Sequence, residues 1–261
     1  VFRIAAKPPV KNTGDTGHAA WFEYLNSKFQ KCTPVNLRNE APSHNGSSRC
    51  FQSQVNGNKK IAIIGDSHAE DLFLGLAEAL PGVNIVYYIG GPLPSINKKE
   101  YENIYKFVVN DPEITTVIIS AYWSQRLENM PKDSNLEKEL DKTVKALTTA
   151  RKRVYIVDDI PDFSFDPQKC KYSKMFSQHT CSKDKNLFMA KRSTYYWALE
   201  TIEKNNPTVT ILHLWQYFCS ENTCDMAKDG ILFYRDNNHL NINGSQYVGK
   251  KIIDDNPLLA Q

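Results

Sequence analysis

The stretch AIIGDSHAEDL, residues 62–72, joins a continuous apolar run to Gly-Asp-Ser-His and then directly to a second apolar pattern. An apolar run that ends in glycine is typical of a strand buried on both faces. The residues that follow have the spacing of an amphipathic helix beginning near Ala69. Ser67 therefore stands where a strand meets a helix. Either Asp66 or Ser67 caps this helix, or Ser67 is a nucleophile, which requires a base nearby.

The same order of strand and helix repeats along the chain from residue 59 onward, with no internal repeat and no low-complexity tract. Apolar strands that alternate with helices form a parallel sheet covered on both faces, so we expect an α/β fold. Ser134, followed by Glu137 three residues later, is the expected N-cap of the third helix of this series. The expected strands are 60–65, 83–90, 115–123, 153–161 and 208–215, and the expected helices are 70–80, 98–111, 134–151, 185–206 and 243–255.

Residues 1–58 differ from the rest, because they have little strand pattern and many polar, Pro, Gly and Asn residues. One short helix is expected within 18–30. We interpret 1–58 as an extension packed on a main domain formed by 59–261. The opening residues VFRIAAKPPV lack the apolar segment of a signal peptide and do not begin with methionine. We therefore expect the chain to be part of a longer precursor.

Length, composition and charge exclude several classes of protein. With 261 residues, 41% of them hydrophobic and 23% charged, the chain can form a sizeable core and resembles ordinary globular proteins. The net charge of +3 is too small to indicate nucleic-acid binding. No apolar run reaches the roughly 18 to 20 residues that cross a bilayer.

The cysteines indicate the compartment. Six occur, as three pairs that are each separated by a short, loop-like segment, and six cysteines allow 15 pairings. The local pairings are geometrically the easiest. A zinc site is the rival, but no C-x-x-C occurs and the one C-x4-C has no matching second pair. Disulfides imply an oxidising compartment: periplasm, secretory lumen or cell exterior. The predicted disulfides are Cys32–Cys50, Cys170–Cys181 and Cys219–Cys224.

The hypothesis that Ser67 is a nucleophile requires a base that can remove its proton. His68 is adjacent in sequence, but neighbouring side chains diverge. His239 is the better candidate, since Asp236 stands three residues before it and could hold the imidazole through its Nδ1–H group. The alternative is an ordinary turn before the last helix. Ligands of open α/β sheets bind at the carboxyl ends of the strands, where we also find Gly90, Gly91, Trp123 and Ser124.

The segments IAIIGDSHAEDL and DGILFYRDNNHLNINGSQYV together resemble the SGNH (GDSL-type) hydrolase superfamily. The nearer resemblance is to the SGNH domain fused to membrane acyltransferase family 3 proteins, which O-acetylate bacterial surface polysaccharides. It covers roughly residues 59–254, and paired cysteines fit this subgroup. It implies a flavodoxin-like three-layer αβα sandwich with a five-stranded parallel sheet. Near its C-terminal end the chain matches the family pattern Y-x-D-x-x-H-L-x-x-x-G with Tyr234, Asp236, His239, Leu240 and Gly244.

The resemblance also implies residue roles: Ser67 as nucleophile, His239 as general base and then acid, and Asp236 as the group that orients His239. The oxyanion hole would use the Ser67 N–H group, which lies at a helix N-terminus, and either Gly90 or Gly91. The alternative for both glycines is a tight turn. Asp66, His68, Trp123 and Ser124 are candidates for the pocket lining.

One departure from the superfamily concerns the asparagine that completes the oxyanion hole, for which this chain has ISAYWSQR, residues 119–126. Losing one such donor costs about 100- to 1000-fold in rate in other acyl-transfer enzymes. Either another group substitutes, or hydrolysis is slow, which would suit a transferase. The other histidines are expected to have core or surface roles: His18, His44, His179 and His213.

The leading functional hypothesis is transfer of an acyl group, most simply acetyl, to a sugar hydroxyl of a bacterial surface polysaccharide such as O-antigen, in the periplasm. The acyl group would reach Ser67 from a membrane acyltransferase domain, fused N-terminally, and ultimately from acetyl-CoA. No resident cofactor, metal or nucleic acid is expected. A carbohydrate esterase, with water as acceptor, and a non-catalytic saccharide-binding module remain alternatives.

Overall fold

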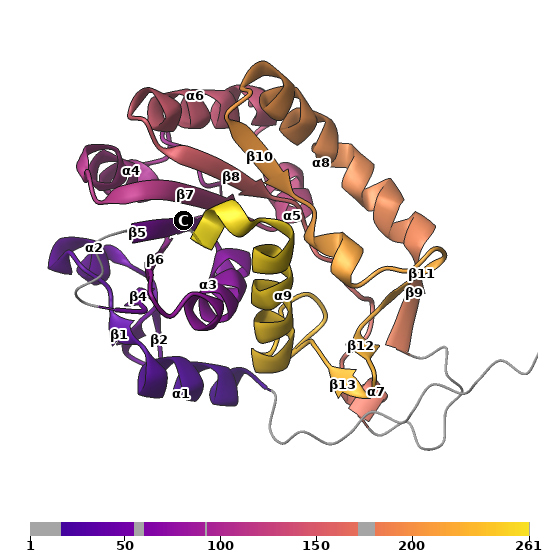
Figure 1. Cartoon of the computed structure of the whole chain (residues 1–261). Helices are drawn as coiled ribbons and strands as arrows, with labels where there is room; N and C mark the ends of the chain where they lie inside the picture. The colour runs from indigo at the N-terminus through magenta and orange to yellow at the C-terminus, as the bar shows by residue number, and fades with distance from the viewer. Residues whose placement is uncertain (1–16, 55–59, 92, 172–180, 261) are drawn as a thin grey trace, which may run out of the picture.

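A computed structural model describes residues 17–54, 60–91, 93–171 and 181–260. Its centre is a sheet in which five neighbouring strands run parallel, in the order β6-β5-β7-β8-β10. The parallel sheet expected from the strand–helix alternation is confirmed (Figure 1). Gly65 pairs with both Ile89 and Ser120, and Ser120 pairs with Val157, so the carboxyl ends of four strands lie level. The strands are β5 (Lys60–Gly65), β6 (Asn84–Ile89), β7 (Ile114–Ser120), β8 (Arg153–Val157) and β10 (Val209–Leu212).

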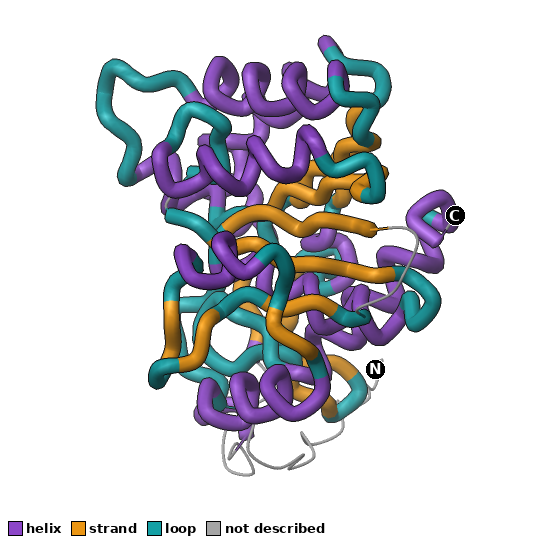
Figure 2. Tube along the Cα trace, turned by 90° about the vertical axis from the view of Figure 1, so that its left-hand side faces the viewer, coloured by secondary structure: helices purple, strands orange, loops and turns teal. Residues whose placement is uncertain are grey.

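Helices cover both faces of this sheet, which gives the three-layer sandwich (Figures 1 and 2). Each face has its own apolar core, because the strands are buried on both sides. One face carries α1 (His18–Lys28), α3 (Ser67–Ala79) and α9 (Ile242–Asp255). The other carries α2 (Val35–Glu40), α4 (Lys99–Asn110), α6 (Leu136–Thr149) and α8 (Lys185–Asn205). None of the helices in the described residues has the length and hydropathy needed to cross a bilayer.

The N-terminal segment contributes to the sheet itself, which the sequence pattern did not predict. Strands β1 (Gln30–Lys31) and β4 (Phe51–Gln52) add antiparallel beyond β6 and extend the sheet to seven strands. The Cys32–Cys50 disulfide ties these two strands together at one end. A hairpin of β2 (Ser43–His44) and β3 (Ser47–Ser48) lies between them in the sequence. The domain boundary that we predicted between residues 58 and 59 falls outside the described residues.

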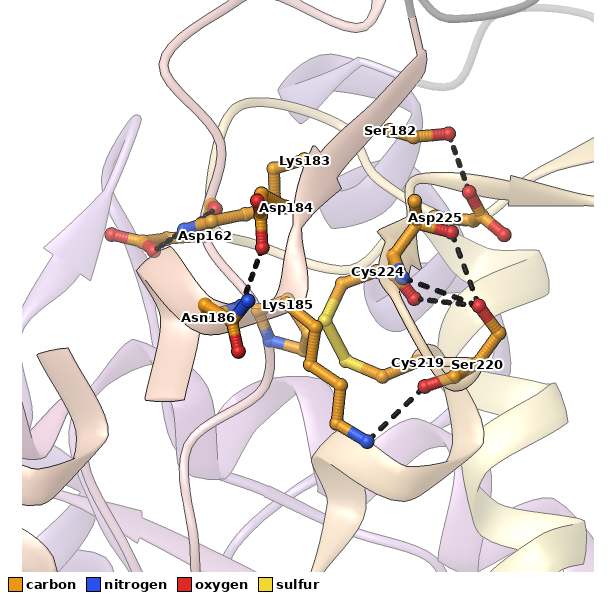
Figure 3. Close-up of a disulfide and its surroundings, with 12 residues drawn as sticks. Asp162, Ser182, Lys183, Asp184, Lys185, Asn186, Cys219, Ser220, Cys224 and Asp225 are labelled. Atoms are coloured by element: carbon orange, nitrogen blue, oxygen red, sulfur yellow. Dashed lines mark hydrogen bonds and ion pairs between the residues drawn. A yellow bond between two sulfur atoms is a disulfide. The ribbon is translucent and has the colours of Figure 1, made fainter. Parts of the chain in front are cut away.

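All three predicted disulfides are confirmed. Cys219–Cys224 closes a short loop beside the antiparallel pair β9 (Ser182–Asp184) and β11 (Thr223–Asp225), where Asp184 caps α8 (Figure 3). The remaining elements are short and were not predicted: α5 (Trp123–Glu128), α7 (Gln168–Lys171), β12 (Ala227–Lys228), β13 (Ile231–Leu232), η3 (Leu214–Tyr217) and η4 (Pro257–Ala260).

Several local predictions are wrong, and the fourth and fifth expected strands end at Val157 and Leu212 rather than at 161 and 215. Asn135, and not Ser134, caps α6, because its side chain accepts a hydrogen bond from the Lys138 N–H group. The third strand ends at Ser120, before Trp123, which instead opens α5. Aromatic residues favour strands, and this preference extended the predicted strand too far.

Candidate active site

Ser67 is the first residue of α3 and follows the buried end of β5. The helix cap is Asp66, whose Oδ1 accepts a hydrogen bond from the His68 N–H group at 2.9 Å. Asp66 adopts the extended backbone conformation that is normal for a cap. Since the cap is supplied by its neighbour, the Ser67 hydroxyl is left for another partner.

That partner is His239, whose Nε2 lies 2.7 Å from the Ser67 Oγ. On the other side of the ring, His239 Nδ1 lies 2.8 Å from Asp236 Oδ2. A carboxylate only accepts, so Nδ1 carries the hydrogen, and the neutral ring presents the Nε2 lone pair to the serine. The three residues brought together are the three predicted from the two motifs.

Asp236 is held as an anion. Its Oδ1 accepts hydrogen bonds from the backbone N–H groups of Asn238 and His239, at 2.9 and 2.7 Å. Burial opposes ionisation, but the interactions with His239 and these N–H groups outweigh it and hold the pKa of Asp236 well below its usual range. The carboxylate can therefore orient His239 and stabilise an imidazolium.

The loop that carries His239 is fastened to α3 by a buried ion pair. Asp71 Oδ1 lies 2.6 Å from Arg235 Nη1, and Asp71 Oδ2 accepts a hydrogen bond from the Leu240 N–H group at 2.9 Å. Burial raises the pKa of Asp71 to about 6, against the attraction of Arg235. Neither Asp71 nor Arg235 was predicted as a site residue. Asp71 stands four residues after Ser67, a spacing that places both on one helix face and is the signal that could have identified it.

Helices α3 and α9 also meet directly, through two glycines. A Cβ atom at Gly75 would lie 1.9 Å from the carbonyl oxygen of Ser245, and one at Gly249 would lie 2.2 Å from the carbonyl carbon of Gly75. Ser245 Oγ accepts a hydrogen bond from the Gly75 N–H group at 3.0 Å. Ser67 is the first residue of α3, and His239 lies just before α9. The close approach of the two helices therefore helps to fix the distance between Ser67 and His239.

His68 forms a wall of the site beside His239. Its ring stacks on Tyr122 with centroids 4.7 Å apart, and it meets the His239 ring edge to face at 5.3 Å. Burial lowers the pKa of His68 to about 3, so the ring is uncharged at neutral pH. His68 thus supports the catalytic candidate sterically and is no competing base.

The two glycines proposed for the oxyanion hole differ. The Gly90 N–H group donates to the Gly65 carbonyl at 3.2 Å, and a Cβ atom at Gly90 would lie 2.6 Å from the Tyr101 ring. Gly90 is therefore required for packing, and its N–H group is already used. Within the described residues, the N–H groups of Gly91 and Ser67 have no hydrogen-bond acceptor.

The segment that replaces the expected asparagine is fixed by buried carboxylates. Asp66 Oδ2 accepts from the Tyr122 N–H group and from Arg126, and Asp159 accepts from the Trp123 N–H group. The Trp123 side chain, which we predicted as pocket lining, is instead fully buried and donates its indole N–H to the Val157 carbonyl. Ser124 is also buried. Arg126 was not predicted, and it places a guanidinium beside the cap of α3.

Two histidines that we expected to be unremarkable make specific contacts. His18 Nε2 lies 2.9 Å from Asp236 Oδ2, although it comes from the extension. His213 directly follows β10, and its Nδ1 lies 3.3 Å from buried Asp158. His44 stacks on Phe22 with ring centroids 4.0 Å apart, and His179 lies outside the described residues. No sequence pattern links His18 to Asp236, since the contact depends on how the extension folds.

In the described part of the chain, no three His, Cys, Asp or Glu side chains are grouped as metal ligands. The absence of a metal cofactor stays a prediction.

Comparison with known proteins places this site in a family. The family model described as the SGNH domain fused to AT3 domains matches residues 31–254. No curated protein matches the chain closely enough to indicate a relationship. Among solved structures, the periplasmic domain of a lipopolysaccharide acetyltransferase from Salmonella ser. Paratyphi A is similar, with a TM-score of 0.59 and 15% identity over 93% of this chain and 99% of that one.

An acetyl xylan esterase is similar with a TM-score of 0.50 and 16% identity, over 75% of this chain and 98% of that one. At such identities the two structures support the fold alone. The family match covers most of the chain and includes both the Ser67 and the His239 segments. The chain therefore belongs to the family of SGNH domains that are fused to AT3 domains.

Proposed function

We propose that this domain is a serine-dependent O-acyltransferase that transfers an acyl group, most simply acetyl, to a hydroxyl group of a bacterial surface polysaccharide. The observation that carries the proposal is the hydrogen-bonded series from Asp236 through His239 to Ser67, which ends on a serine at a helix N-terminus. Such an arrangement activates a hydroxyl that is otherwise a poor nucleophile.

In the first step, His239 Nε2 accepts the proton of Ser67 while Oγ attacks the carbonyl carbon of the acyl donor. We propose that the N–H groups of Ser67, at the start of α3, and of Gly91, two residues after the end of β6, stabilise the tetrahedral oxyanion. When the oxyanion collapses, the bond to the donor's leaving group breaks, and that group takes the proton from His239. The acyl group is now an ester of Ser67.

In the second step, His239 accepts the proton of a sugar hydroxyl, whose oxygen attacks the acyl-Ser67 carbonyl. The ester bond to Ser67 breaks as the new ester forms, and Ser67 Oγ regains its proton from His239. The same residues that form the intermediate therefore resolve it. Asp236 remains ionised in both steps and stabilises the imidazolium of His239.

Transfer to a sugar, rather than to water, is supported by the family. Its members are fused to AT3 domains, and a similar structure is the periplasmic domain of a lipopolysaccharide acetyltransferase. We propose that this domain also works in the periplasm, where three disulfides are stable. We further propose that a membrane acyltransferase domain supplies acyl groups that originate from acetyl-CoA, with no resident cofactor on this domain.

A carbohydrate esterase is the second candidate, because the same three residues would serve water as the acceptor and because an acetyl xylan esterase has a similar fold. The segment ISAYWSQR lacks the asparagine that completes the oxyanion hole in the superfamily. One missing donor lowers rates by about 100- to 1000-fold, which favours slow hydrolysis and a longer-lived acyl-enzyme.

The test uses p-nitrophenyl acetate as donor, with and without polysaccharide, for the wild type, Ser67→Ala and His239→Ala. Ser193→Ala is the matched control, since Ser193 is exposed on α8 and bonds only its own helix. We expect turnover and acetylated polysaccharide from the wild type and the control, and neither from the two site variants. Turnover without acetylated polysaccharide would indicate an esterase, and an active Ser67→Ala would overturn the mechanism.

A further inference from the structure

The first turn of α1 lies against the loop that carries the catalytic candidates. His18 and Trp21 are three residues apart and therefore share one face of α1. His18 contacts Asp236, and the Trp21 ring lies over the guanidinium of Arg235 at 4.3 Å. One turn of the N-terminal extension thus contacts both Arg235 and Asp236, which are adjacent residues of the loop that carries His239.

Trp21 fixes this turn in place. Its side chain is 1% exposed, and its indole N–H donates to Oε1 of buried Glu70 at 3.0 Å. Glu70 lies on α3, three residues after Ser67. The position of His18 is therefore set by a buried anchor that is itself attached to the helix of the nucleophile.

His18 shares a single carboxylate oxygen with His239. Asp236 Oδ2 lies 2.9 Å from His18 Nε2 and 2.8 Å from His239 Nδ1, and the two rings are inclined at 68° with centroids 6.1 Å apart. Asp236 Oδ1 is occupied by two backbone N–H groups. His18 is thus a second histidine on the carboxylate oxygen that contacts His239.

The charge of His18 suits this role. Burial and the neighbouring Arg235 lower the pKa of His18, so the ring is neutral at pH 7. It can donate from Nε2 to the carboxylate without adding a positive charge that would compete with an imidazolium at His239. His239 is therefore the one of these two histidines whose positive charge Asp236 stabilises during the reaction.

We propose that His18 is a positioning residue of the active site, which holds the Asp236 carboxylate in the orientation that aligns His239 with Ser67. The proposal rests on the proposed acyl-transfer function. It makes the N-terminal extension a part of the active site, beyond its role in extending the sheet. His18 itself needs to touch neither donor nor acceptor.

The test compares His18→Ala with His44→Ala in the full chain. His44 is the matched control, because it belongs to the same extension and stacks on Phe22 of α1 without contacting the triad. We expect His18→Ala to lower kcat for p-nitrophenyl acetate about 10-fold, the lower end of what a hydrogen bond to a charged group contributes. KM and the melting temperature should stay near the wild-type values, and His44→Ala should keep its kcat.

Chemical rescue separates positioning from a structural effect. The His18 side chain is 54% exposed, so imidazole can enter the space left by His18→Ala and restore kcat, after subtraction of the rate that Ser67→Ala shows in the same imidazole. His18→Gln, which retains an N–H donor, should recover part of the activity. Equal losses in the His18 and His44 variants, no rescue, or an unchanged kcat would each overturn the proposal. An active Ser67→Ala would instead overturn the proposed function.

Discussion

Removing the Asp71 carboxylate should weaken both the fold and the active site, because this group joins α3 to the loop of His239. Asp71→Ala leaves Arg235 buried without its closest carboxylate and leaves the Leu240 N–H group without an acceptor. Loss of one partner from a buried ion pair costs about 3 to 5 kcal/mol. Burial already raises the pKa of Asp71 to about 6, so desolvation offsets part of the attraction. We therefore expect the lower end, about 3 kcal/mol in the free energy of unfolding.

For a domain of this size, about 3 kcal/mol corresponds to a melting temperature lower by about 6 to 12 °C. Urea titration and thermal unfolding measure the change. At 25 °C, kcat for p-nitrophenyl acetate should also fall at least about 10-fold, since small displacements of a catalytic group are costly. Asp71→Asn retains an acceptor for the Leu240 N–H group and should recover part of the activity.

Asp141→Ala is the matched control. Asp141 also forms an ion pair, with Lys145 at 2.7 Å, but the Lys145 side chain is 65% exposed. Exposed pairs contribute about 0 to 1 kcal/mol. If Asp71→Ala changed the free energy of unfolding no more than Asp141→Ala, the ion pair with Arg235 would not be what fastens the loop, and the reasoning would be refuted.

Two further predictions concern helix packing and acid stability. Gly75→Ala forces a Cβ atom to within 1.9 Å of the Ser245 carbonyl oxygen, so α3 and α9 must separate, and we expect a loss of about 1 to 3 kcal/mol together with lower kcat. Gly82→Ala, where a Cβ atom would have no heavy atom within 4 Å, is the control in the same unfolding and kinetic measurements and should change neither quantity. For Asp162, burial opposes ionisation, but hydrogen bonds from Lys191, Tyr122 and Lys183 outweigh it and lower the pKa below the usual value. A lowered pKa stabilises the fold above about pH 4 and loses that effect as the pH falls further, so Asp162→Asn should be less stable at neutral pH and lose less stability on acidification. A parallel shift of the whole curve of stability against pH would contradict this explanation.

Much of the sheet could be predicted because each parallel strand is buried on both faces and so appears as a continuous apolar run. The segment Lys60–Gly65 is the clearest case, since prediction and structure agree at both ends. The strands of the extension could not be predicted, because β1 and β4 have two residues each and show no periodicity. Their pairing depends on the edge of β6 and on the Cys32–Cys50 disulfide.

The triad was predictable from motif order, since Ser67 and His239 follow recognisable patterns at opposite ends of the main domain. The residues that hold the triad in place were harder to predict from the sequence. Asp71 carried a spacing signal on α3, whereas Arg235 and His18 acquire their partners only in the folded chain. Trp123 shows the reverse error: an aromatic residue near the motif suggested a pocket wall, but packing directed it into the core.

The central claim is that an acyl group passes through Ser67, and mass spectrometry of the rapidly quenched protein tests it directly. After mixing with p-nitrophenyl acetate, we expect a single acetyl group on the peptide that contains Ser67, and a faster loss of this group when the acceptor polysaccharide is added. Ser67→Ala should carry none. Polysaccharide that became acetylated while Ser67 remained unmodified at every time point, or with Ser67→Ala, would contradict the account.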